Sequence, residues 1–398
     1  MTFFHNTSDD TNKHESTSTS HLHPKEKSLI VQNQHLKLKV HSLGMSIMEL
    51  QVKEPRKKEE VTVDEKRDEN GLLVKKDVIE EITKDFHAST SYSPIIQVHE
   101  DVLHNLAENQ SFNCIVGRNA NRTNKASFTL NHQRYHLDRN WKDHFLHGNI
   151  GKVNWGIQAH AQDESKKQVL GALLSEDGDQ GFPCQVRFDC CYDIADHQIT
   201  ILMKAHNLDE TRSTPISLTH HMYWNLSGNY EDVRHSHMLW INAKYYTPVN
   251  DDLIPTGDVI RVNKELDFFT EPKIIGEDMS QKLLNSSLAG YDHNFVLNQR
   301  DRDPKTGLVL AAELTHVRTR RFVKIYTTLP GLQFYTGNHL KGQRTKEGRG
   351  LMPWAGVCLE PQYFPDSVNH AHFPSTIVHA GRVWRHQIIY VFGRLDDE

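Results

Sequence analysis

The sequence predicts an all-β protein, built as a large antiparallel β-sandwich with few short helices. Segments that alternate apolar and polar residues recur along the chain, as at 36–40 and 198–205, and this period of two is typical of strands with one buried face. Breakers rich in Gly, Pro, Asp and Asn, such as NDDLIPTGD, separate them. Because few segments repeat at helical period, antiparallel pairing of successive strands is favoured.

The strands can be placed in chain order by the same pattern. A chain of 398 residues is long enough to bury one large core beneath them. The adjacent Cys190 and Cys191 fall within one such segment, so their side chains are expected on opposite faces of the sheet. The clearest segments lie at 36–40, 48–52, 126–131, 167–174, 185–193, 198–205, 215–222, 307–314, 321–328 and 385–392.

The chain divides into a tail, one domain and an insertion. Residues 1–27 are rich in Ser, Thr and His and carry few core-forming side chains, so they are expected to form a disordered polar tail. Residues 28–395 are expected to form a single β-sandwich domain. A charged insertion interrupts it at about 54–92, with a short amphipathic helix expected at 78–86. A weaker helical pattern occurs at 278–288.

Composition excludes several classes of partner. The net charge is −5, from 46 basic and 51 acidic residues, so no basic excess indicates nucleic acid. The five cysteines are scattered and odd in number, which argues against a disulfide framework and favours a reducing, cytoplasmic location. The N-terminus lacks a signal-peptide pattern, and no apolar run is long enough to cross a membrane.

The densest stretch of candidate residues is GVCLEPQYFPDSVNHAHFP, from Gly356 to Pro374. A short apolar run there delivers one carboxylate, Glu360, and the following Pro361 is expected to end the strand. A carboxylate in this position suits either a pocket or a solvated strand end, and the local pattern leaves both interpretations open.

A second dense stretch is LTHHMYWNLSG, at 218–228. His220 and His221 are adjacent on a predicted strand, so one is expected on each face. Tyr223 and Trp224 follow, and aromatic faces beside polar groups suit a sugar ring. The alternative is a core histidine with a structural tryptophan. Shorter polar stretches of the same kind are GRNANR, FLHG, YDHNF and GLQFYTGN.

Histidine is abundant, with 27 residues, so a metal site needs weighing. The H-x-H pairs at 235/237 and 370/372 are not followed by the carboxylate and third histidine of a cupin-like centre, so no metal is expected. The chain also lacks G-x-S-x-G, G-x-x-x-x-G-K-[ST] and G-x-G-x-x-G, which removes support for a hydrolase elbow, a P-loop and dinucleotide binding.

Taken together, these stretches resemble the aldose 1-epimerase (galactose mutarotase) family. The resemblance runs from about residue 28 to about residue 394. Each motif is weak alone, but eight in the family's order make a specific match. In chain order they read GRNANR, FLHG, SEDGDQGFP, LTHHMYWNLSG, TPVNDDLIPTG, YDHNF, GLQFYTGN and CLEPQYFPDSVNHAHFP.

The resemblance implies a fold and an activity. The family's fold is the large β-sandwich of the galactose mutarotases. Its members are isomerases of hexose metabolism that interconvert the α and β anomers of free hexoses such as galactose and glucose. No cofactor is implied, because neither redox nor group transfer occurs. The implied partner is a small-molecule hexose, with no nucleic acid or membrane, and the protein is expected to be a monomer or a weak dimer.

The resemblance also implies roles for individual residues. Glu360 matches the family's catalytic base, and His221 matches the catalytic acid. The residues that match family positions for binding sugar hydroxyls are His147, Arg122, Asn121, Asp292 and Gln333.

Several positions depart from the family pattern. His220 replaces the usual asparagine, Trp224 the usual phenylalanine, and Asn149 the second glycine of the leucine-histidine-glycine-glycine motif. These changes are expected to alter the pocket wall. They keep two alternatives open: a non-catalytic sugar-binding protein of the same fold, and a hexose-6-phosphate mutarotase that uses Arg122 and Lys341.

Overall fold

A computed structural model describes residues 27–55, 88–97, 111–161, 166–280, 290–341 and 350–395. Strands make up 48% of the structure and helices 8%, so the all-β prediction is confirmed. The polar tail up to residue 26 and the helix predicted at 78–86 lie outside the described residues. Most of the helical candidate at 278–288 also lies outside them, and its first three residues are not helical.

The largest sheet contains nine strands, and each neighbouring pair is antiparallel. Its strands, in spatial order, are β10 (Gly156–Ala161), β11 (Lys166–Ser175), β12 (Val186–Ala195), β13 (Gln198–Asn207), β27 (Val383–Arg394), β23 (Arg321–Thr327), β22 (Val309–His316), β17 (His237–Ile241) and β20 (Lys273–Ile274).

Two smaller sheets complete the main layers. The six-stranded sheet runs in the order β16 (Tyr223–Trp224), β25 (Val357–Gln362), β24 (Gly331–Tyr335), β21 (Asp292–Val296), β18 (Tyr245–Thr247) and β19 (Ile260–Arg261). The N-terminal sheet runs in the order β1 (Ser28–Gln32), β2 (Leu36–His41), β3 (Ser46–Pro55) and β4 (Ala88–Gln97).

Short elements connect these sheets. Four two-stranded ribbons pair β5 (Ile115–Val116) with β15 (Thr219–His220), β6 (Arg122–Thr123) with β9 (Phe145–Leu146), β7 (Ser127–Leu130) with β8 (Gln133–His136), and β14 (Thr214–Pro215) with β26 (Ile377–Val378). The described helical turns are α3 (Val233–Ser236), η1 (Asn124–Ala126), η2 (Ile150–Lys152), η3 (Asp179–Gly181), η4 (Lys264–Leu266), η6 (Gln299–Asp301) and η7 (Ser367–Asn369).

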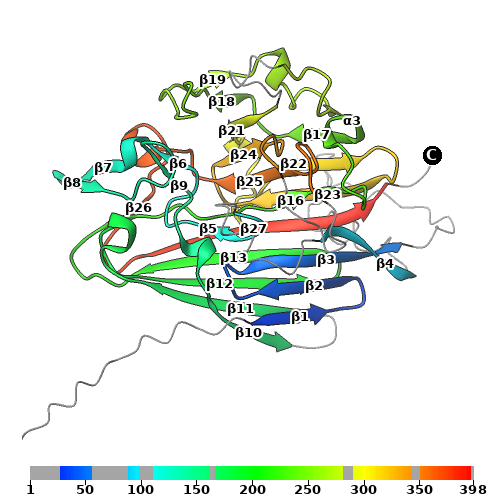
Figure 1. The fold of residues 1–398 in the computed structure, drawn as a ribbon, viewed down its shortest axis with the longest axis horizontal. Helices are drawn as coiled ribbons and strands as arrows, with labels where there is room; N and C mark the ends of the chain where they lie inside the picture. Colours follow the sequence, from blue (N-terminus) through cyan, green and yellow to red (C-terminus); the bar gives the residue numbers. More distant parts are fainter. Residues whose placement is uncertain are drawn as a thin grey trace, which may run out of the picture.

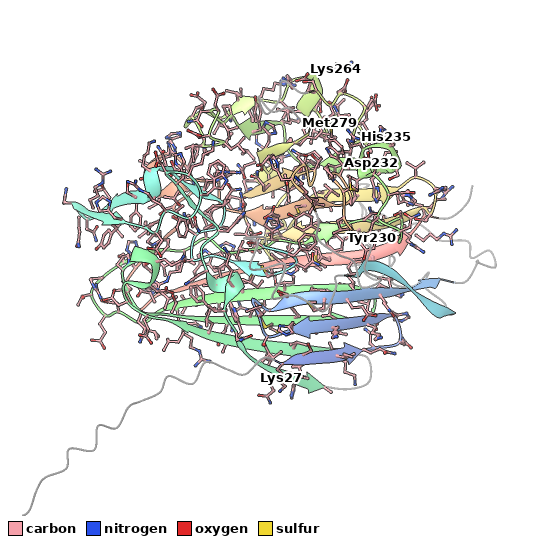
Figure 2. The ribbon with its side chains drawn as sticks, viewed as in Figure 1. Lys27, Tyr230, Asp232, His235, Lys264 and Met279 are labelled. Atoms are coloured by element: carbon pink, nitrogen blue, oxygen red, sulfur yellow. The ribbon has the colours of Figure 1, made fainter. Side chains whose placement is uncertain are left out.

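Figure 1 shows how the sheets are arranged in space. Strands β1–β3 and β10–β13 lie at one end of the molecule, the six-stranded sheet lies towards the other, and the long strand β27 runs between them. Strand β3 contacts β27, and β1 contacts β10 and β11, so the first and last parts of the domain pack together. In Figure 2, Lys27 and Lys264 mark opposite ends of the molecule.

Burial along the strands follows the predicted period of two. On β12, Val186, Phe188 and Tyr192 are buried, whereas Arg187 is exposed and Asp189 is half-buried. Cys190 is buried and its neighbour Cys191 only half-buried, which confirms that they point to opposite faces. The Tyr192 hydroxyl donates a hydrogen bond of 2.6 Å to the carbonyl of Met45, which ties the nine-stranded sheet to the N-terminal strands.

Strand β25 is an exception, because all six of its residues are buried. The expectation that Pro361 ends this strand is wrong, since β25 continues to Gln362. The neighbouring strand β16 pairs only with Val357 and Cys358, so no strand on that side requires an N–H from Pro361. The Pro361 carbonyl instead accepts a hydrogen bond of 2.7 Å from the Thr219 hydroxyl.

The ends of the expected insertion at 54–92 belong to the N-terminal sheet. Strand β3 continues to Pro55, and β4 begins at Ala88 and pairs with β3. The segment between them, 56–87, lies outside the described residues.

The Tyr192–Met45 hydrogen bond gives a test of how the sheets are joined. Tyr192→Phe keeps the ring and removes the buried hydroxyl, so we expect the free energy of unfolding to fall by about 1–3 kcal/mol. Urea unfolding measures the change. Tyr245→Phe is the matched control, because Tyr245 is 47% exposed and its change should stay within about 0.5 kcal/mol. Equal values for the two variants would contradict the structural role of this bond.

Candidate active site

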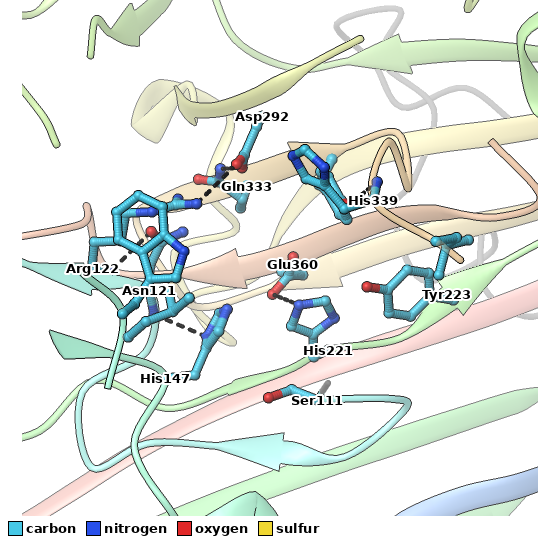
Figure 3. Close-up of a pocket in the computed structure, with 14 residues that line it drawn as sticks. Ser111, Asn121, Arg122, His147, His221, Tyr223, Asp292, Gln333, His339 and Glu360 are labelled. Atoms are coloured by element: carbon cyan, nitrogen blue, oxygen red, sulfur yellow. Dashed lines mark hydrogen bonds and ion pairs between the residues drawn. The ribbon is translucent and has the colours of Figure 1, made fainter. Parts of the chain in front are cut away.

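A pocket of about 300 Å³ opens beside the six-stranded sheet. All seven site residues implied by the family resemblance line it, although they are spread widely along the chain. They are Asn121, Arg122, His147, His221, Asp292, Gln333 and Glu360. Figure 3 shows these side chains converging on one space from several strands and loops.

Three adjacent strands supply the carboxylate side of the pocket. Glu360 on β25 is paired directly with Gln333 on β24, so their side chains stand on the same face of the sheet. Gln333 is in turn paired with Asn294 on β21. Asp292 lies two residues before Asn294 and shares its face. The strand register therefore places Glu360, Gln333 and Asp292 on one face of the sheet.

Backbone hydrogen bonds to residues 113 and 114 fix the opposite wall of the pocket, which carries His221. His221 follows β15 directly, and its N–H donates to the Cys114 carbonyl at 2.9 Å. The N–H of Asn113 donates to the His221 carbonyl at 2.9 Å, and the Asn113 side chain donates to the Ile47 carbonyl at 3.2 Å. The Asn113 side-chain oxygen also accepts from the N–H of Tyr223. Asn113 therefore fixes the His221 segment to strand β3.

His220 and His221 point in opposite directions, as predicted. His221 lines the pocket. His220 is fully buried behind it, with its Nδ1 atom 3.2 Å from the Tyr390 hydroxyl and its Nε2 atom 3.2 Å from the Asn113 carbonyl. The core-histidine interpretation thus applies to His220 alone. Trp224 is also fully buried, packed edge-on against Tyr390.

The loop that carries His147 requires one glycine. Gly148 has a φ of +71°, and a Cβ atom there would lie 2.2 Å from the Gly117 carbonyl oxygen.

Asn149 has a φ of −117°, which any residue adopts, and its side chain donates to Asp179 at 3.2 Å. The expectation that Asn149, His220 and Trp224 alter the pocket wall is wrong, because none of them lines the pocket.

Glu360 and His221 form the titratable centre of the pocket. The distance from Glu360 Oε2 to His221 Nε2 is 3.7 Å, and Glu360 is only 2% exposed (Figure 3). Burial raises the pKa of Glu360 well above its usual range, Asp292 adds to this effect and Arg122 opposes it. Burial lowers the pKa of His221 to about 4. Burial thus favours a protonated carboxyl on Glu360 and a neutral imidazole on His221.

The polar side chains that line the sheet side of the pocket are hydrogen-bonded to one another. Arg122 Nη2 lies 3.3 Å from Asp292 Oδ2, and the Gln333 amide donates to Asp292 Oδ1 at 2.6 Å (Figure 3). Gln362 donates to the Gln333 amide oxygen at 3.4 Å. These contacts fix the orientation of donors and acceptors before any ligand binds, an arrangement suited to the hydroxyl groups of a sugar.

His147 is held as a neutral hydrogen-bond donor. Its pKa is lowered well below the usual value, mainly by burial and then by His221 and Arg122. Its Nδ1 atom accepts the N–H of Asn121 at 3.2 Å. A neutral imidazole that accepts at Nδ1 carries its proton on Nε2, so His147 has one N–H left to donate.

The sequence motifs did not identify six further residues that line the pocket. Tyr335 could have been found, because it lies two residues after Gln333 on β24 and shares its face. Leu146 lies inside the FLHG motif but was not singled out, and the remaining four lie outside the quoted motifs. The six are Ser111, Trp141, Leu146, Tyr335, His339 and Leu340.

The described residues contain a group with the donor atoms for a metal ion. One donor atom each from His221, Cys358 and Glu360 lies within 4.8 Å of the others. Cys358 and Glu360 are two residues apart on β25 and so share a face, and Cys358 Sγ is 3.6 Å from His221 Nδ1. Burial raises the pKa of the Cys358 thiol well above its usual value, which opposes the thiolate form that binds metals.

Comparison with known proteins identifies the family. A model of the aldose 1-epimerase family matches residues 92–391. The chain is 31% identical to galactose mutarotase of Sus scrofa over 291 residues, covering 72% of this chain and 80% of that protein. It is 34% identical to aldose 1-epimerase of Escherichia coli (strain K12) over 263 residues, covering 65% and 72%. The chain therefore belongs to the aldose 1-epimerase family and is an isomerase.

Solved structures agree in fold. An aldose epimerase homologue from C. elegans superposes with a TM-score of 0.74 at 21% identity, covering 93% of this chain and all of that one. Galactose 1-epimerase from Lactobacillus acidophilus NCFM gives a TM-score of 0.68 at 18% identity, with 93% and 95% coverage. Among the described residues, no helix is long and apolar enough to cross a membrane.

The two buried imidazoles of His220 and His221 predict acid-sensitive stability. The folded-state pKa values of His220 and His221 are lowered to about 3 and about 4, against about 6.5 in the unfolded chain. As pH falls from about 6.5 to about 4, the unfolded chain therefore binds protons that the folded chain does not. We expect each imidazole to remove up to about 1.4 kcal/mol of stability per pH unit in this window.

Urea unfolding at several pH values measures this loss. The control is His220→Asn, which removes one of the buried imidazoles. Its stability should depend less steeply on pH than that of the wild type, by about one proton. Identical slopes for the two proteins would show that His220 is not neutral and buried in the folded state.

Proposed function

We propose that this protein interconverts the α and β anomers of free hexoses, galactose and glucose, with Glu360 as the base and His221 as the acid. The observation that carries the proposal is the buried pair itself, 3.7 Å apart in a pocket lined with fixed hydrogen-bonding groups. Membership of the aldose 1-epimerase family and the names of the relatives support the same reaction.

The chemistry requires one group that removes a proton and one that delivers a proton. Opening a cyclic hemiacetal removes the proton of the C1 hydroxyl and protonates the ring oxygen. Glu360 takes the first proton, and His221 delivers the second. The C1–C2 bond then rotates, and the ring closes on the other face of the carbonyl with the two roles reversed. Positioned acid and base groups each contribute on the order of 10²–10⁴-fold to such a reaction.

One proton on Glu360 is enough for this cycle. Burial favours the neutral pair, in which the proton is on Glu360. Transfer of that proton to His221 creates the carboxylate and the imidazolium that the reaction needs, without exchange with solvent. A substrate hydroxyl that donates to Glu360 stabilises the carboxylate and so favours the transfer.

The remaining polar residues orient the sugar. Asp292 offers acceptor oxygens, Arg122 and His147 offer donors, and the Gln333 amide offers both. Asn121 supports this set, because its N–H fixes the His147 ring. Fixed partners of this kind also discriminate between epimers, since a misplaced hydroxyl leaves a buried polar group unpaired. None of these steps calls for a metal or another cofactor.

Free sugars suit the pocket better than hexose 6-phosphates. Arg122 is already paired with Asp292, and Lys341 does not line the pocket. Comparing rates on glucose and glucose 6-phosphate separates the two substrates. A non-catalytic sugar binder would need no buried acid–base pair, and sugar binding without rate enhancement would favour that alternative.

Cysteine chemistry supports a reducing, cytoplasmic location. All five cysteines are free thiols, and four of them are buried. We propose that the protein acts there on small-molecule sugars, as a monomer or a weak dimer, without nucleic acid or membrane partners.

Removing the base tests the assignment directly. Glu360→Gln keeps the shape of the side chain but cannot accept the C1 proton, so we expect enzymatic mutarotation to fall about 10²- to 10⁴-fold. The measurement is polarimetry of freshly dissolved α-D-galactose and α-D-glucose, with the spontaneous rate subtracted. Glu313→Gln on β22 is the matched control and should keep full activity, because Glu313 pairs with Lys324 away from the pocket.

Three results would oppose the proposal. A wild-type protein that accelerates neither sugar would remove the proposed activity. Full activity in Glu360→Gln would show that another group is the base, and a matching loss in Glu313→Gln would show that the assay reports folding.

The pH dependence of kcat/KM tests the shared proton. Below the pKa of His221, at about 4, the pair holds two protons and has no base. Above the raised pKa of Glu360 it holds none and has no acid. We therefore expect activity to persist well below the usual histidine pKa and to fall only near pH 4. An acidic limb near pH 6.5 would show that His221 titrates as an ordinary imidazole.

A further inference from the structure

Trp141 occupies a position in the pocket that the function described above does not explain. It lines the pocket beside Arg122, Leu146 and His147. The Arg122 guanidinium lies over the Trp141 indole ring, with its central carbon 4.6 Å from the ring centroid. This distance is within the range of a cation–π interaction, which is stronger for tryptophan than for other aromatic residues.

Arg122 depends on few other contacts for its orientation. Its Nη2 atom is paired with Asp292 at 3.3 Å, and its buried Nε atom has no hydrogen-bond partner. A guanidinium carries five N–H donors in one plane, so the orientation of that plane decides which donors face a ligand. The contact with Asp292 fixes one end of the group, and the Trp141 ring fixes the plane.

The turn that carries Trp141 is itself well anchored. Trp141 and His144 form an isolated antiparallel bridge, and the Asn140 side chain makes two hydrogen bonds to the backbone of Leu146, at 2.7 and 2.8 Å. Lys142 Nζ lies 4.8 Å from the centroid of the Trp141 ring and 2.7 Å from Asp252. The turn is thereby attached to the pocket loop on one side and to the 250–254 turn on the other.

We propose that Trp141 is a positioning residue for substrate binding: its indole ring sets the plane of the Arg122 guanidinium so that the free donors face a hydroxyl of the bound hexose. This proposal rests on the function proposed above. Trp141 acts on affinity for the sugar, whereas proton transfer by Glu360 and His221 does not depend on it.

Two substitutions of Trp141 separate the effect of its aromatic ring from the effect of an apolar side chain. Trp141→Leu keeps an apolar side chain without a π-face, and we expect it to raise KM for galactose about 2- to 30-fold, the range of a cation–π contact. Trp141→Phe keeps a weaker aromatic face and should restore part of this loss. The kcat of both variants should stay within about twofold of the wild type, because the acid–base pair is intact.

A double-mutant cycle tests whether the effect passes through Arg122. In an Arg122→Ala background, Trp141→Leu should have no further effect on KM. Trp240→Phe is the control for loss of a tryptophan, since Trp240 donates to the Phe269 carbonyl on another part of the molecule and does not line the pocket. It should leave kcat and KM unchanged.

Several outcomes would overturn the role of Trp141. These are an unchanged KM in Trp141→Leu, equal effects of Trp141→Leu with and without Arg122, or a loss of kcat at constant KM. Calorimetric titration with galactose gives Kd for each variant independently of turnover. If the wild type binds galactose but does not accelerate mutarotation, the proposed function fails, and the dependence of Kd on Trp141 still decides this inference.

Discussion

The structure depends on the burial of a carboxylate opposite an imidazole. Glu360 lies on β25, the one strand of the six-stranded sheet with every residue buried, so its ionised form loses most of its solvation. His221, 3.7 Å away, is equally unable to hold a charge by itself. Burial thus disfavours the charged form of both groups, and an opposite charge 3.7 Å away offsets part of that cost. This arrangement suits the proton transfer proposed for the pair, and the surrounding sheets supply the buried environment that shifts both pKa values.

The surrounding groups show why a β-sandwich suits such a pair. Strand register places Glu360, Gln333 and Asp292 on one face of the sheet, so adjacent strands fix their relative positions. The loops contribute on the other side, where special backbone conformations are required: His147 and Asn121 have φ values of +59° and +64°. Such conformations are costly for residues other than glycine and persist only where the surroundings fix them. The sheets thus fix the geometry of the proposed acid–base pair, and the loops fix His147 and Asn121 beside it.

Much of this arrangement could be predicted from the sequence. The period-two pattern located the long strands, and the ordered motifs located all seven residues that converge on the pocket. The strand end at Pro361 was mispredicted because the missing N–H matters only where a neighbouring strand needs it, and β16 stops short of that position. The pocket wall was misassigned to Asn149, His220 and Trp224 because one motif can contain both core and pocket residues. Trp141 and Ser111 could not be found, since only tertiary structure brings them to the site.

Asn113 joins two distant parts of the chain to its own segment, because its contacts reach Ile47 and the pair His221 and Tyr223. Such long-range contacts affect how fast the protein folds. The pocket residues span the sequence from Ser111 to Glu360. Strand β27, which packs against β3, lies near the C-terminal end of the chain. Contacts of such large sequence separation close slowly, because the entropy of long loops is lost before the contacts form. During synthesis, β13 must therefore wait with an unpaired edge until its partner β27 has been made, so we expect slow folding and a dependence on protection from aggregation.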